Sequence, residues 1–496
     1  MIRSPLPLPD AARAYTEAAP PGDWTFFDQA PIDRAGVPAF VAAYVPDDPA
    51  RACTRLQINT GYGETPEQAM IGAAAETYEY LCARTGLAGR PVVRGSYAEL
   101  VRERGVRGVA DPLTLCLPAG SPVDRDTPLA WTEGRWFADD APVLVPLDIV
   151  ALDPAQLPDG YRPFTTLITN GQGAGPTRDW ATGHGLFELL QRDGNGLRFK
   201  AMDAGVAIDC EGAPEGIRRL LSDLRGKGLE VTPKLATTEF GVANVYVVGP
   251  DADPTAPAVP IALTATGEGC DLDAATAVRK AILEYAHARA RKAVSHGTLE
   301  QIAPVLPDGH WDRIAPIVEA EAQRAEPRQV DAFRYWLGMS GPALKALLSD
   351  PLYQVRETVP FADLPRSDID TPEAKGREAA RRLSERGMDT IVVDLSPDDA
   401  PMHAAQVITP GLEVETLSYY RIGERNTAKL LEMDSPLIVF GEETEARRPV
   451  RMPPERYERF GGVPLLDTAA VDRTVGDLYP LYREPSEHQM IFRRTA

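Results

Sequence analysis

The sequence predicts an α+β fold built from repeated strand–turn–helix units. Three observations predict it. Segments of one plan recur three times along the chain, each follows a run rich in β-branched and aromatic residues, and helical and strand patterns alternate elsewhere. Alternation of this kind is typical of a mixed α+β or α/β core.

The first copy of the repeat is GYGETPEQAMIGAAAETYEY, residues 61–80. Its Gly-x-Gly is followed by a Thr two residues on, by an Ala four residues later, and by Glu76 seven residues after that Ala. Thr65 suits a helix N-cap and Pro66 the first helical position. We therefore expect a helix here, after a strand in ACTRLQINT from Ala52.

The second copy, GAGPTRDWATGHGLFELLQR at residues 173–192, keeps the same spacing up to Glu188. The third begins GEGCDLDAATAVRKAILEY at Gly267 and keeps the distance from its Ala to Glu284, with two extra residues in its turn. Strands are expected before them, in YRPFTTLITN from residue 161 and VPIALTAT from residue 259, and Thr177 and Asp273 are the expected caps.

Further elements follow from the same signals. Helices are expected at residues 213–228 and 371–387, and strands at 244–249 and 389–395. Residues 102–162 are rich in Pro, Asp and Gly and are predicted to form surface loops. The last 60 or so residues are polar and broken by Pro, which predicts an appendage to the core.

Composition excludes several classes of function. The chain has 496 residues and a formal net charge of −20, which repels nucleic acid and anionic membranes as main partners. The N-terminus lacks the apolar run of a signal peptide, and no membrane-length apolar stretch follows, so we expect a cytoplasmic protein. The five cysteines and six histidines show no spacing typical of a zinc site or a disulfide framework. The familiar nucleotide-loop and hydrolase motifs are missing from the sequence.

The repeated helices carry acidic or polar residues three positions apart, and such residues share a helix face. The pairs are Glu76 with Glu79, Glu188 with Gln191, and Glu284 with His287. A solvated face explains any single pair, but three equivalent glutamates in pseudo-symmetric units would converge. Converging carboxylates require a cation, and Mg²⁺ shared between carboxylates and substrate phosphates is the common arrangement.

The pattern therefore predicts a Mg²⁺–nucleotide site, in which Arg192, Arg279 and Lys280 could neutralise phosphate oxygens. Two alternatives remain open at this level. The glycine turns are either anion-binding nests or plain tight turns. His184 and His287 are either structural or functional.

Three segments together resemble the signatures of the YcaO family. They are GYGETPEQAMIGAAAETYEY, TNGQGAGPTRDWATGHGLFELLQRD and GEGCDLDAATAVRKAILEY, in that order, and PIDRAGVPAF resembles the family's N-terminal strand. The resemblance covers Pro31 to Glu413 and implies a YcaO-like domain at 31–413, between an N-terminal extension, 1–30, and a C-terminal appendage, 414–496. It also implies the family's ATP-binding fold, with the repeats around the nucleotide site.

The resemblance implies function as well. Family members bind ATP and Mg²⁺ and activate backbone amides of ribosomally made precursor peptides, giving an azoline, a thioamide or an amidine. By resemblance, the metal positions are Glu76, Glu79, Glu188 and Gln191, and the nucleotide-contacting positions are Asn170, Arg192, Lys280 and Glu284. No nucleophile–base pair is recognisable, so no catalytic residue is assigned.

The chain departs from the family pattern at four of these motif positions. Gln191 replaces a metal-binding Glu, Lys280 replaces an Arg, Tyr62 replaces a Lys and Gly72 replaces a Ser. The ending SEHQMIFRRTA also differs from the Pro-x-Pro-x-Pro ending of azoline-forming members.

Two functions follow as hypotheses. The first is an ATP-dependent amide-activating enzyme. The second is a catalytically degenerate homologue that acts as a scaffold or peptide-binding subunit. Because only about 30 residues precede the matched region, we expect a partner protein to recognise the leader peptide or deliver sulfur. A homodimer is a further hypothesis, because the sequence does not determine the oligomeric state.

Overall fold

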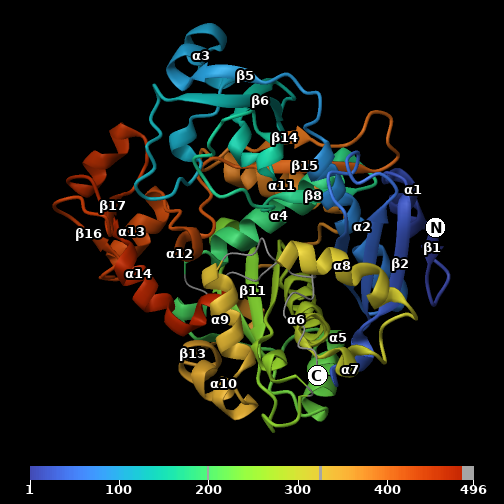
Figure 1. The fold of residues 1–496 in the computed structure, drawn as a ribbon. Helices are drawn as coiled ribbons and strands as arrows, with labels where there is room; N and C mark the ends of the chain where they lie inside the picture. The colour runs from blue at the N-terminus through green and yellow to red at the C-terminus, as the bar shows by residue number, and fades with distance from the viewer. Residues whose placement is uncertain (198–199, 258, 323–326, 483–496) are drawn as a thin grey trace. The chain divides into compact units, whose positions relative to one another are not determined.

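A computed structural model describes residues 1–197, 200–257, 259–322 and 327–482 (Figure 1). The chain divides into two compact units. Unit 1 is Met1–Leu81, Phe199–Asp368 and Asp477–Ala496, and unit 2 is Cys82–Arg198 and Ile369–Gly476. The boundaries predicted near residues 30 and 413 divide the chain into consecutive segments, whereas the two units each combine segments that are distant in the sequence. The predicted boundaries stay a prediction. Within the described ranges, no helix is long and apolar enough to cross a membrane.

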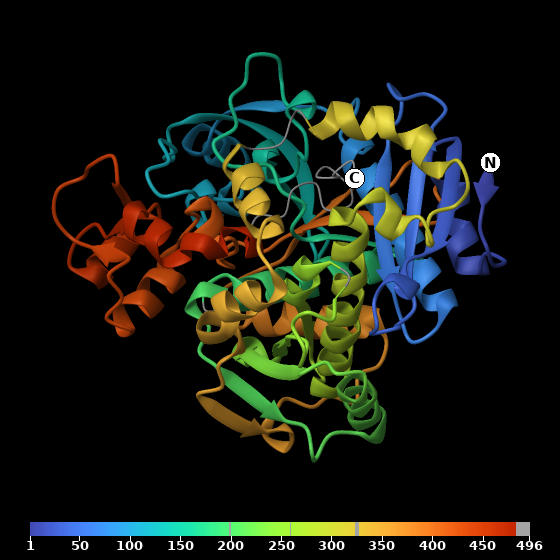
Figure 2. The ribbon, with the colours of Figure 1, turned by 60° about the horizontal axis from the view of Figure 1, so that its bottom comes forward.

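The first sheet of unit 1 has the order β1-β2-β3-β4. Its strands are β1 (Ile2–Arg3), β2 (Gly22–Asp28), β3 (Ala39–Pro46) and β4 (Gln57–Tyr62), with β1 parallel to β2 and the other pairs antiparallel. Phe27 and Ile58 project from one face and pack against Ile314 and Val318 of α8 (His310–Ala322), which follows the short α7 (Leu299–Ile302) (Figure 2).

The other face of this sheet receives α1 (Asp10–Ala18) and α2 (Pro66–Thr85). Gly61 of β4 lies directly against the α2 backbone, and Tyr15 of α1 contacts Tyr78 of α2 with ring centroids 5.7 Å apart. The alternation of strand side chains between the two faces thus buries β2, β3 and β4 on both sides.

The second sheet of unit 1 has the order β12-β11-β10-β9-β13. These strands are Gly267–Asp271, Ala243–Val248, Thr232–Thr237, Val206–Asp209 and Glu357–Pro360. Val245 and Val247 face α5 (Glu215–Gly226) and α6 (Ala274–His296) in one core cluster. Tyr246 and Val248 face the opposite way, toward α9 (Pro327–Leu337) and α10 (Gly341–Leu348).

A buried arginine fixes the C-terminal half of α6 within unit 1. Arg289 is fully buried and donates from Nε and Nη2 to the Asp33 carboxylate, at 2.9 and 3.0 Å. It also donates from Nη1 to Asp251 at 2.8 Å. A buried guanidinium is tolerated because paired carboxylates supply both charge and hydrogen bonds. The helix that carries Lys280 and Glu284 is therefore anchored one to two turns beyond them.

Unit 2 is built on a sheet of order β5-β6-β14-β15-β8, with β7 also paired to β6. Its strands are β5 (Val93–Ser96), β6 (Pro128–Trp136), β7 (Pro142–Pro146), β8 (Gln172–Gly175), β14 (Ile391–Asp394) and β15 (His403–Ile408). Helices α4 (Arg178–Asn195) and α11 (Pro372–Ser384) pack together through Gly183 and Gly376, where an added Cβ on Gly376 would lie 2.6 Å from the other glycine's Cα.

The remainder of unit 2 completes the fold around this sheet. Leu100 of α3 (Tyr97–Arg104) joins Trp131 and Leu144 in a core cluster. Helices α12, α13 and α14 follow at Thr416–Tyr419, Glu424–Glu432 and Thr468–Val475. A small sheet of order β16-β18-β17 is formed by Ile438–Val439, Leu465–Asp467 and Arg447–Pro449.

The α+β class is confirmed, together with the helices expected near 213–228 and 371–387 and the strands near 244–249 and 389–395. The strand predictions before the second and third repeats are wrong in position. Residues 161–170 form no strand, and Pro260–Thr264 form a 3-10 helix. The glycine segments themselves are the strands, β8 and β12. The β-branched residues before them lie in a loop and in a 3-10 helix instead, and Ile261 and Thr264 of the 3-10 helix are fully buried.

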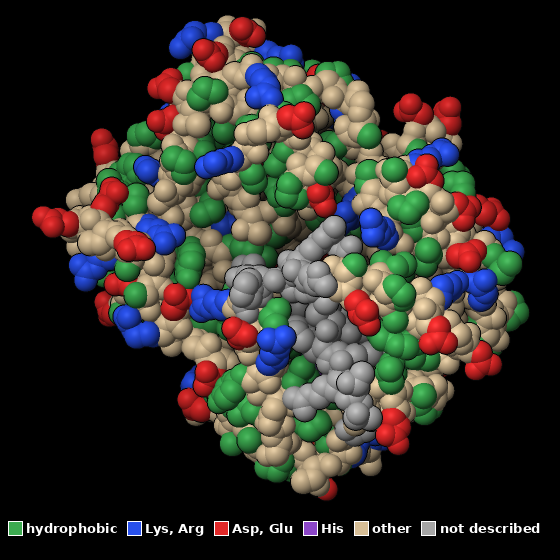
Figure 3. All heavy atoms as spheres, in the orientation of Figure 1, with side chains coloured by type: hydrophobic (Ala, Val, Ile, Leu, Met, Phe, Trp, Pro, Cys, Tyr) green, Lys and Arg blue, Asp and Glu red, His purple; other side chains and the backbone are tan. Residues whose placement is uncertain are grey.

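The loop prediction for residues 102–162 is also wrong, because β6 and β7 lie there and Trp131 is fully buried. Pro, Asp and Gly in this segment separate short buried strands. The ending SEHQMIFRRTA lies outside the described residues. On the face drawn in Figure 3, acidic side chains are interspersed with Lys and Arg, so the net negative charge does not form one acidic patch there.

Candidate functional site

The three repeats share a close contact between a strand glycine and a helix backbone. A Cβ added to Gly61 would lie 2.3 Å from the carbonyl oxygen of Ala69, eight residues later. The corresponding distances are 2.1 Å from Gly173 to the Ala181 oxygen and 2.2 Å from Gly269 to the Ala277 oxygen. Any side chain would collide with backbone at these positions, so glycine is required for strand and helix to meet.

This contact corrects the predicted register of the third copy. Gly269, and not Gly267, occupies the place of Gly61 and Gly173. Counted from that glycine, the helix cap follows four residues later and the glutamate fifteen residues later in every copy. The third turn therefore contains no extra residues, and the Gly-x-Gly of that copy lies two residues further up its strand.

The predicted helix caps are confirmed in all three copies. Thr65 Oγ1 accepts from the Gln68 N–H at 3.3 Å, Thr177 Oγ1 accepts from the Trp180 N–H at 3.1 Å, and Asp273 Oδ2 accepts from the Thr276 N–H at 3.0 Å. Each helix thus begins at a fixed residue. Because the glutamate lies at the same distance from the cap in each copy, its direction relative to the preceding strand is the same in all three units.

In unit 1, the hydroxyl of Tyr62, at the end of β4, lies beside the carboxylate of Glu284. The Tyr62 hydroxyl donates to Oε2 of Glu284 at 2.8 Å, and its ring stacks on the imidazole of His287 with centroids 5.1 Å apart. Burial, followed by the charges of Glu284, Glu76 and Glu268, raises the pKa of Tyr62 well above its ordinary value. The hydroxyl therefore stays protonated and acts as a hydrogen-bond donor.

The chemistry of this cluster suits a hard cation. The charges of Glu76 from α2, Glu284 from α6 and Glu268 from β12 all act on the Tyr62 hydroxyl, and carboxylate oxygens are the ligands that Mg²⁺ prefers. Glu79 lies three residues beyond Glu76 on α2. Among the described residues, no group of three or more His, Cys, Asp or Glu is already arranged as a metal shell. The donor types fit Mg²⁺, and the assignment of these glutamates as its ligands stays a prediction.

In unit 2, Glu188 and Asn170 lie at the two sides of one glycine. Oε1 of Glu188, on α4, accepts from the Gly171 N–H at 3.2 Å. Gln406 of β15 donates from Nε2 to the Asn170 carbonyl oxygen at 2.7 Å. Gly171 has a φ of +89°, and an added Cβ would lie 2.4 Å from the Val407 oxygen, so only glycine fits. The Asn170 side chain donates from Nδ2 to Glu415 at 3.4 Å.

The other predicted residues have different exposures. Gln191 is buried, at 4% exposure, whereas Arg192 is partly exposed on the same helix and His184 is exposed. Lys280 is partly exposed on α6, one turn before Glu284. Arg279 pairs with Glu64 at 3.7 Å on the surface of unit 1. The predicted roles of these residues stay predictions. The predicted convergence of the three helices on one site stays a prediction as well.

An acidic network beside α4 was not predicted. Asp193 binds Arg425 through both carboxylate oxygens, at 2.6 and 3.1 Å, and accepts from the Glu413 N–H at 2.7 Å. Glu413 in turn accepts from the backbone N–H groups of Gly423, Arg425 and Asn426, at 2.6 to 3.1 Å. The carboxylate thereby caps the N-terminus of α13. Asp193 and Glu413 therefore have structural roles.

Sequence reasoning missed two further candidates. Glu268 stands between the glycines of the third copy, and that position beside a required glycine was the available signal. Glu415 has a φ of +59°, unusual for a residue with a side chain, and its carboxylate accepts from Asn170 and Ser418. No sequence signal pointed to Glu415, because its role depends on a contact across 245 residues.

Comparisons with known proteins agree with the three motifs. The YcaO family model, described as YcaO cyclodehydratase, ATP- and Mg²⁺-binding, matches residues 60–413. An uncharacterized protein of Methanothermobacter thermautotrophicus is 30% identical over 400 residues, which are 79% of this chain and 90% of that protein.

Solved structures share the fold. YcaO from Methanopyrus kandleri, bound with AMPPCP and Mg²⁺, has a TM-score of 0.53 at 22% identity, over 80% of this chain and 88% of that one. A heterocyclase in complex with substrate and cofactor has a TM-score of 0.60 at 18% identity, over 83% of this chain. The match covers 53% of the heterocyclase, so this chain spans about half of its length.

Proposed function

The chain belongs to the YcaO family of ATP- and Mg²⁺-binding proteins, and from that premise we propose that it activates a backbone amide of a ribosomally made precursor peptide. The product would be an azoline, a thioamide or an amidine. The observation that carries the proposal is that the three repeats have a glutamate at the same position. These glutamates are Glu76, Glu188 and Glu284, and all three lie within the region that the family model matches.

The proposed reaction replaces the oxygen of an amide carbonyl. A nucleophile adds to the carbonyl carbon: a Cys, Ser or Thr side chain, an amine, or an external sulfide. The resulting oxyanion takes the γ-phosphoryl group of ATP, and ADP leaves. Elimination of inorganic phosphate then releases the former carbonyl oxygen, and a proton is lost. The reaction consumes one ATP for each amide that is activated. Because the protein forms no covalent bond to the substrate in this scheme, its contribution to catalysis is positioning and charge neutralisation.

We propose roles for the chain's own residues in this scheme. Glu76, Glu79 and Glu188 hold Mg²⁺, which supplies charge neutralisation for the transferred phosphoryl group. Asn170 and Arg192 orient the nucleotide phosphates. Gln191 contributes an amide oxygen where a carboxylate would add charge. Lys280 supplies a point charge in place of a bidentate guanidinium.

The test of the function is a reconstitution with ATP, Mg²⁺ and a candidate precursor peptide encoded beside the gene. Phosphate release that depends on the peptide, together with a mass change of the peptide, is the expected result. Loss of one water indicates an azoline or an amidine, which fragmentation of the peptide distinguishes by the residue that supplied the nucleophile, and exchange of oxygen for sulfur identifies a thioamide. The matched variant Glu76→Gln should abolish both readouts, and Glu432→Gln, an exposed residue of α13, should leave both unchanged.

A second function, a scaffold or peptide-binding subunit without nucleotide turnover, is supported by one contact. Tyr62 stands at the family's Lys position, and its hydroxyl donates a hydrogen bond to the Glu284 carboxylate. Calorimetry separates the two functions. Mg²⁺-dependent ATP binding supports the enzyme, and peptide binding with no ATP binding in either condition supports the scaffold.

We also propose a cytoplasmic complex with a partner protein that recognises the leader peptide or delivers sulfur. Reconstitution with the neighbouring gene products should raise turnover. Full activity of the isolated chain would instead locate the peptide-binding surface within it.

A further inference from the structure

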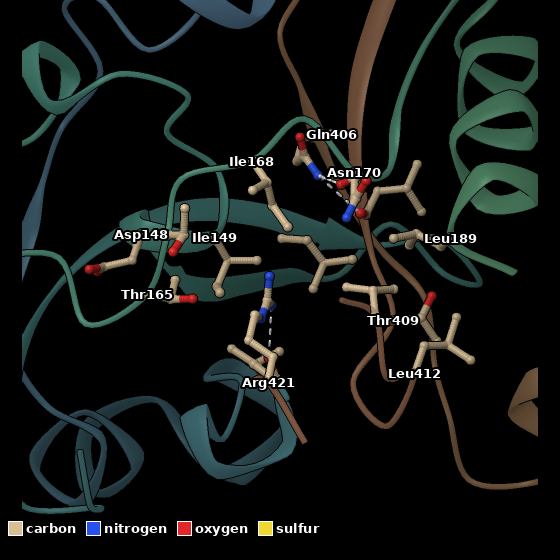
Figure 4. Close-up of a pocket in the computed structure, with 15 residues that line it drawn as sticks. Asp148, Ile149, Thr165, Ile168, Asn170, Leu189, Gln406, Thr409, Leu412 and Arg421 are labelled. Carbon is tan, nitrogen blue, oxygen red and sulfur yellow. Dashed lines mark hydrogen bonds between the residues drawn. The ribbon is translucent and has the colours of Figure 1, made fainter. Parts of the chain in front are cut away.

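A cavity of about 50 Å³ lies inside unit 2. Its lining comes from residues 148–170, the end of β15 and residues 409–421, together with Leu115 and with Leu189 of α4 (Figure 4). This volume has room for a few water molecules or for a small organic ligand. Its walls are mostly aliphatic and include Ile149, Ile168 and Leu412.

A buried arginine reaches into this cavity. Arg421 is 5% exposed, and in Figure 4 its guanidinium rises between Thr165 and Ile149 on one side and Thr409 and Leu412 on the other. Nε donates to the Cys116 carbonyl oxygen at 2.9 Å and Nη2 to the Leu115 carbonyl oxygen at 3.4 Å. Within the described residues these are its hydrogen bonds, and no carboxylate pairs with it.

The charge of Arg421 therefore has backbone carbonyls as its protein partners. A guanidinium has five N–H donors, and two of them are used, so its outer end retains three. Burying a cation without a counter-ion is costly, because the lost hydration is repaid by a nearby anion or by several strong hydrogen bonds.

The backbone holds this arginine in place. The Ala119 N–H donates to the Tyr420 carbonyl oxygen at 2.8 Å, and the Ile422 N–H donates to that of Leu117 at 3.2 Å. The residues on both sides of Arg421 are thus tied to one segment, and the side chain is preorganised rather than adaptable.

Two further polar atoms of the lining have no hydrogen-bond partner in the part of the chain that the structure describes. They are Oγ1 of Thr165, a residue 7% exposed, and Oε1 of Gln406, a residue 1% exposed. Buried polar atoms in native proteins are almost always satisfied. The Thr165 hydroxyl can donate to a bound anion, whereas the Gln406 carbonyl oxygen only accepts and needs a donor such as water.

The cavity's own acid does not supply the missing negative charge. Asp148 accepts from the Tyr161 hydroxyl at 2.7 Å and from the Phe164 N–H at 3.0 Å, and it forms no ion pair with any described residue. In Figure 4 its carboxylate lies at the far side of Thr165 from Arg421. Burial raises the pKa of Asp148 above its ordinary value, which lessens its repulsion of an incoming anion.

We propose that this cavity binds a small carboxylate with a short aliphatic body. The carboxylate takes two N–H groups of Arg421 in the planar, bidentate geometry that guanidinium groups favour, and the Thr165 hydroxyl donates to one of its oxygens. The aliphatic part packs against Ile149, Ile168 and Leu412. A phosphate would also suit the arginine, but it would place polar oxygens against these apolar walls.

The test is calorimetry on the full chain with sodium acetate, sodium isobutyrate and inorganic phosphate. Isobutyrate should bind more tightly than acetate, since it buries more apolar surface, and phosphate should bind most weakly. Arg421→Met, which keeps the length and removes the charge, should weaken isobutyrate binding at least about tenfold. Arg473→Met, at an exposed arginine of the same unit, is the matched control and should not change it.

Because Arg421→Met removes two backbone hydrogen bonds, a second variant guards against misfolding. Thr165→Val keeps the shape and removes the hydroxyl, and it should weaken isobutyrate binding severalfold while the protein stays folded by circular dichroism. Tighter binding of phosphate than of either carboxylate overturns the proposal. So does isobutyrate binding that is unchanged in Arg421→Met and Thr165→Val, or a crystal soaked in isobutyrate that shows only water at Arg421.

Discussion

The hydroxyl of Tyr62 donates a 2.8 Å hydrogen bond to the carboxylate of Glu284, across 222 residues of sequence. This contact joins the first repeat to the third within unit 1, because Tyr62 ends β4 and Glu284 lies on α6. It also places a neutral donor where the family pattern has a lysine. The carboxylates near Tyr62 therefore meet a hydrogen bond rather than a cation.

Replacing the hydroxyl should destabilise the protein in the absence of Mg²⁺. Tyr62→Phe keeps the stacking on His287 and removes one hydrogen bond to a charged group, so we expect a loss of about 1 kcal/mol in the free energy of unfolding. Tyr62→Lys adds a cation among the carboxylates and should be more stable than Tyr62→Phe. Urea unfolding at low salt measures both.

The matched control for these variants is Tyr335→Phe, at a tyrosine that is 52% exposed. It should change the free energy of unfolding by less than about 0.5 kcal/mol. Equal stability of Tyr62→Phe, Tyr62→Lys and the parent protein would show that the carboxylates do not interact with position 62.

The strand glycines predict large and selective effects on stability. Gly61→Ala, Gly173→Ala and Gly269→Ala each place a methyl group within 2.1 to 2.3 Å of helix backbone, which cannot move independently of the helix. We expect losses of about 3 kcal/mol or more, at or above the upper end for overpacking. Gly212→Ala, with nothing within 4 Å of the added Cβ, is the control and should be close to neutral. Thermal unfolding by circular dichroism is the measurement, and tolerance of all three substitutions would contradict the shared contact.

Much of the helical framework was predictable because its signals are local. Thr65, Thr177 and Asp273 bind backbone N–H groups three residues away, so a short window of sequence contains both partners. The spacing from each required glycine to its glutamate is likewise a property of one strand and one helix.

The features that were not predictable depend on distant contacts. The glycines of β4, β8 and β12 were interpreted as turn residues. Glycine is needed there because a helix backbone packs against the strand, and not because the residue has a positive φ. Glu413 lies in the family-matched region, yet its carboxylate caps α13 through residues 423–426. The role of Arg421 in the cavity of unit 2 could not be predicted, because its partners are backbone carbonyl groups about 305 residues away in the sequence.

Acid should weaken α11 through Glu378. Hydrogen bonds from Arg381, and also Arg382, lower the pKa of Glu378 from 4.5 to about 2. A carboxyl whose pKa is lowered on folding contributes stability above its unfolded pKa, and that contribution is lost as pH falls from about 4.5 toward 2. The free energy of unfolding of Glu378→Gln should therefore be below that of the parent protein at pH 6, and the difference should shrink toward pH 2.

The expected size of this difference is small, about 0.5 kcal/mol, because the ion pairs are exposed to solvent. Urea unfolding at several pH values, at low and high salt, measures it. A double-mutant cycle with Arg381→Met isolates the pair. A difference that grows as pH falls would mean that Glu378 is not stabilised by these arginines.

Glu188→Gln tests the proposed role of the second helix in ATP turnover. The glutamine Oε1 can still accept from the Gly171 N–H, as Glu188 Oε1 does at 3.2 Å, so the fold should lose less than about 1 kcal/mol. The negative charge is lost, and for a metal ligand we expect ATP turnover to fall at least about a hundredfold. Gln191→Glu, which adds a carboxylate one turn away, should alter the Mg²⁺ concentration needed for half-maximal turnover. Phosphate release and thermal unfolding are measured together, with Glu432→Gln as the control. Full turnover in a folded Glu188→Gln protein would remove Glu188 from the metal site.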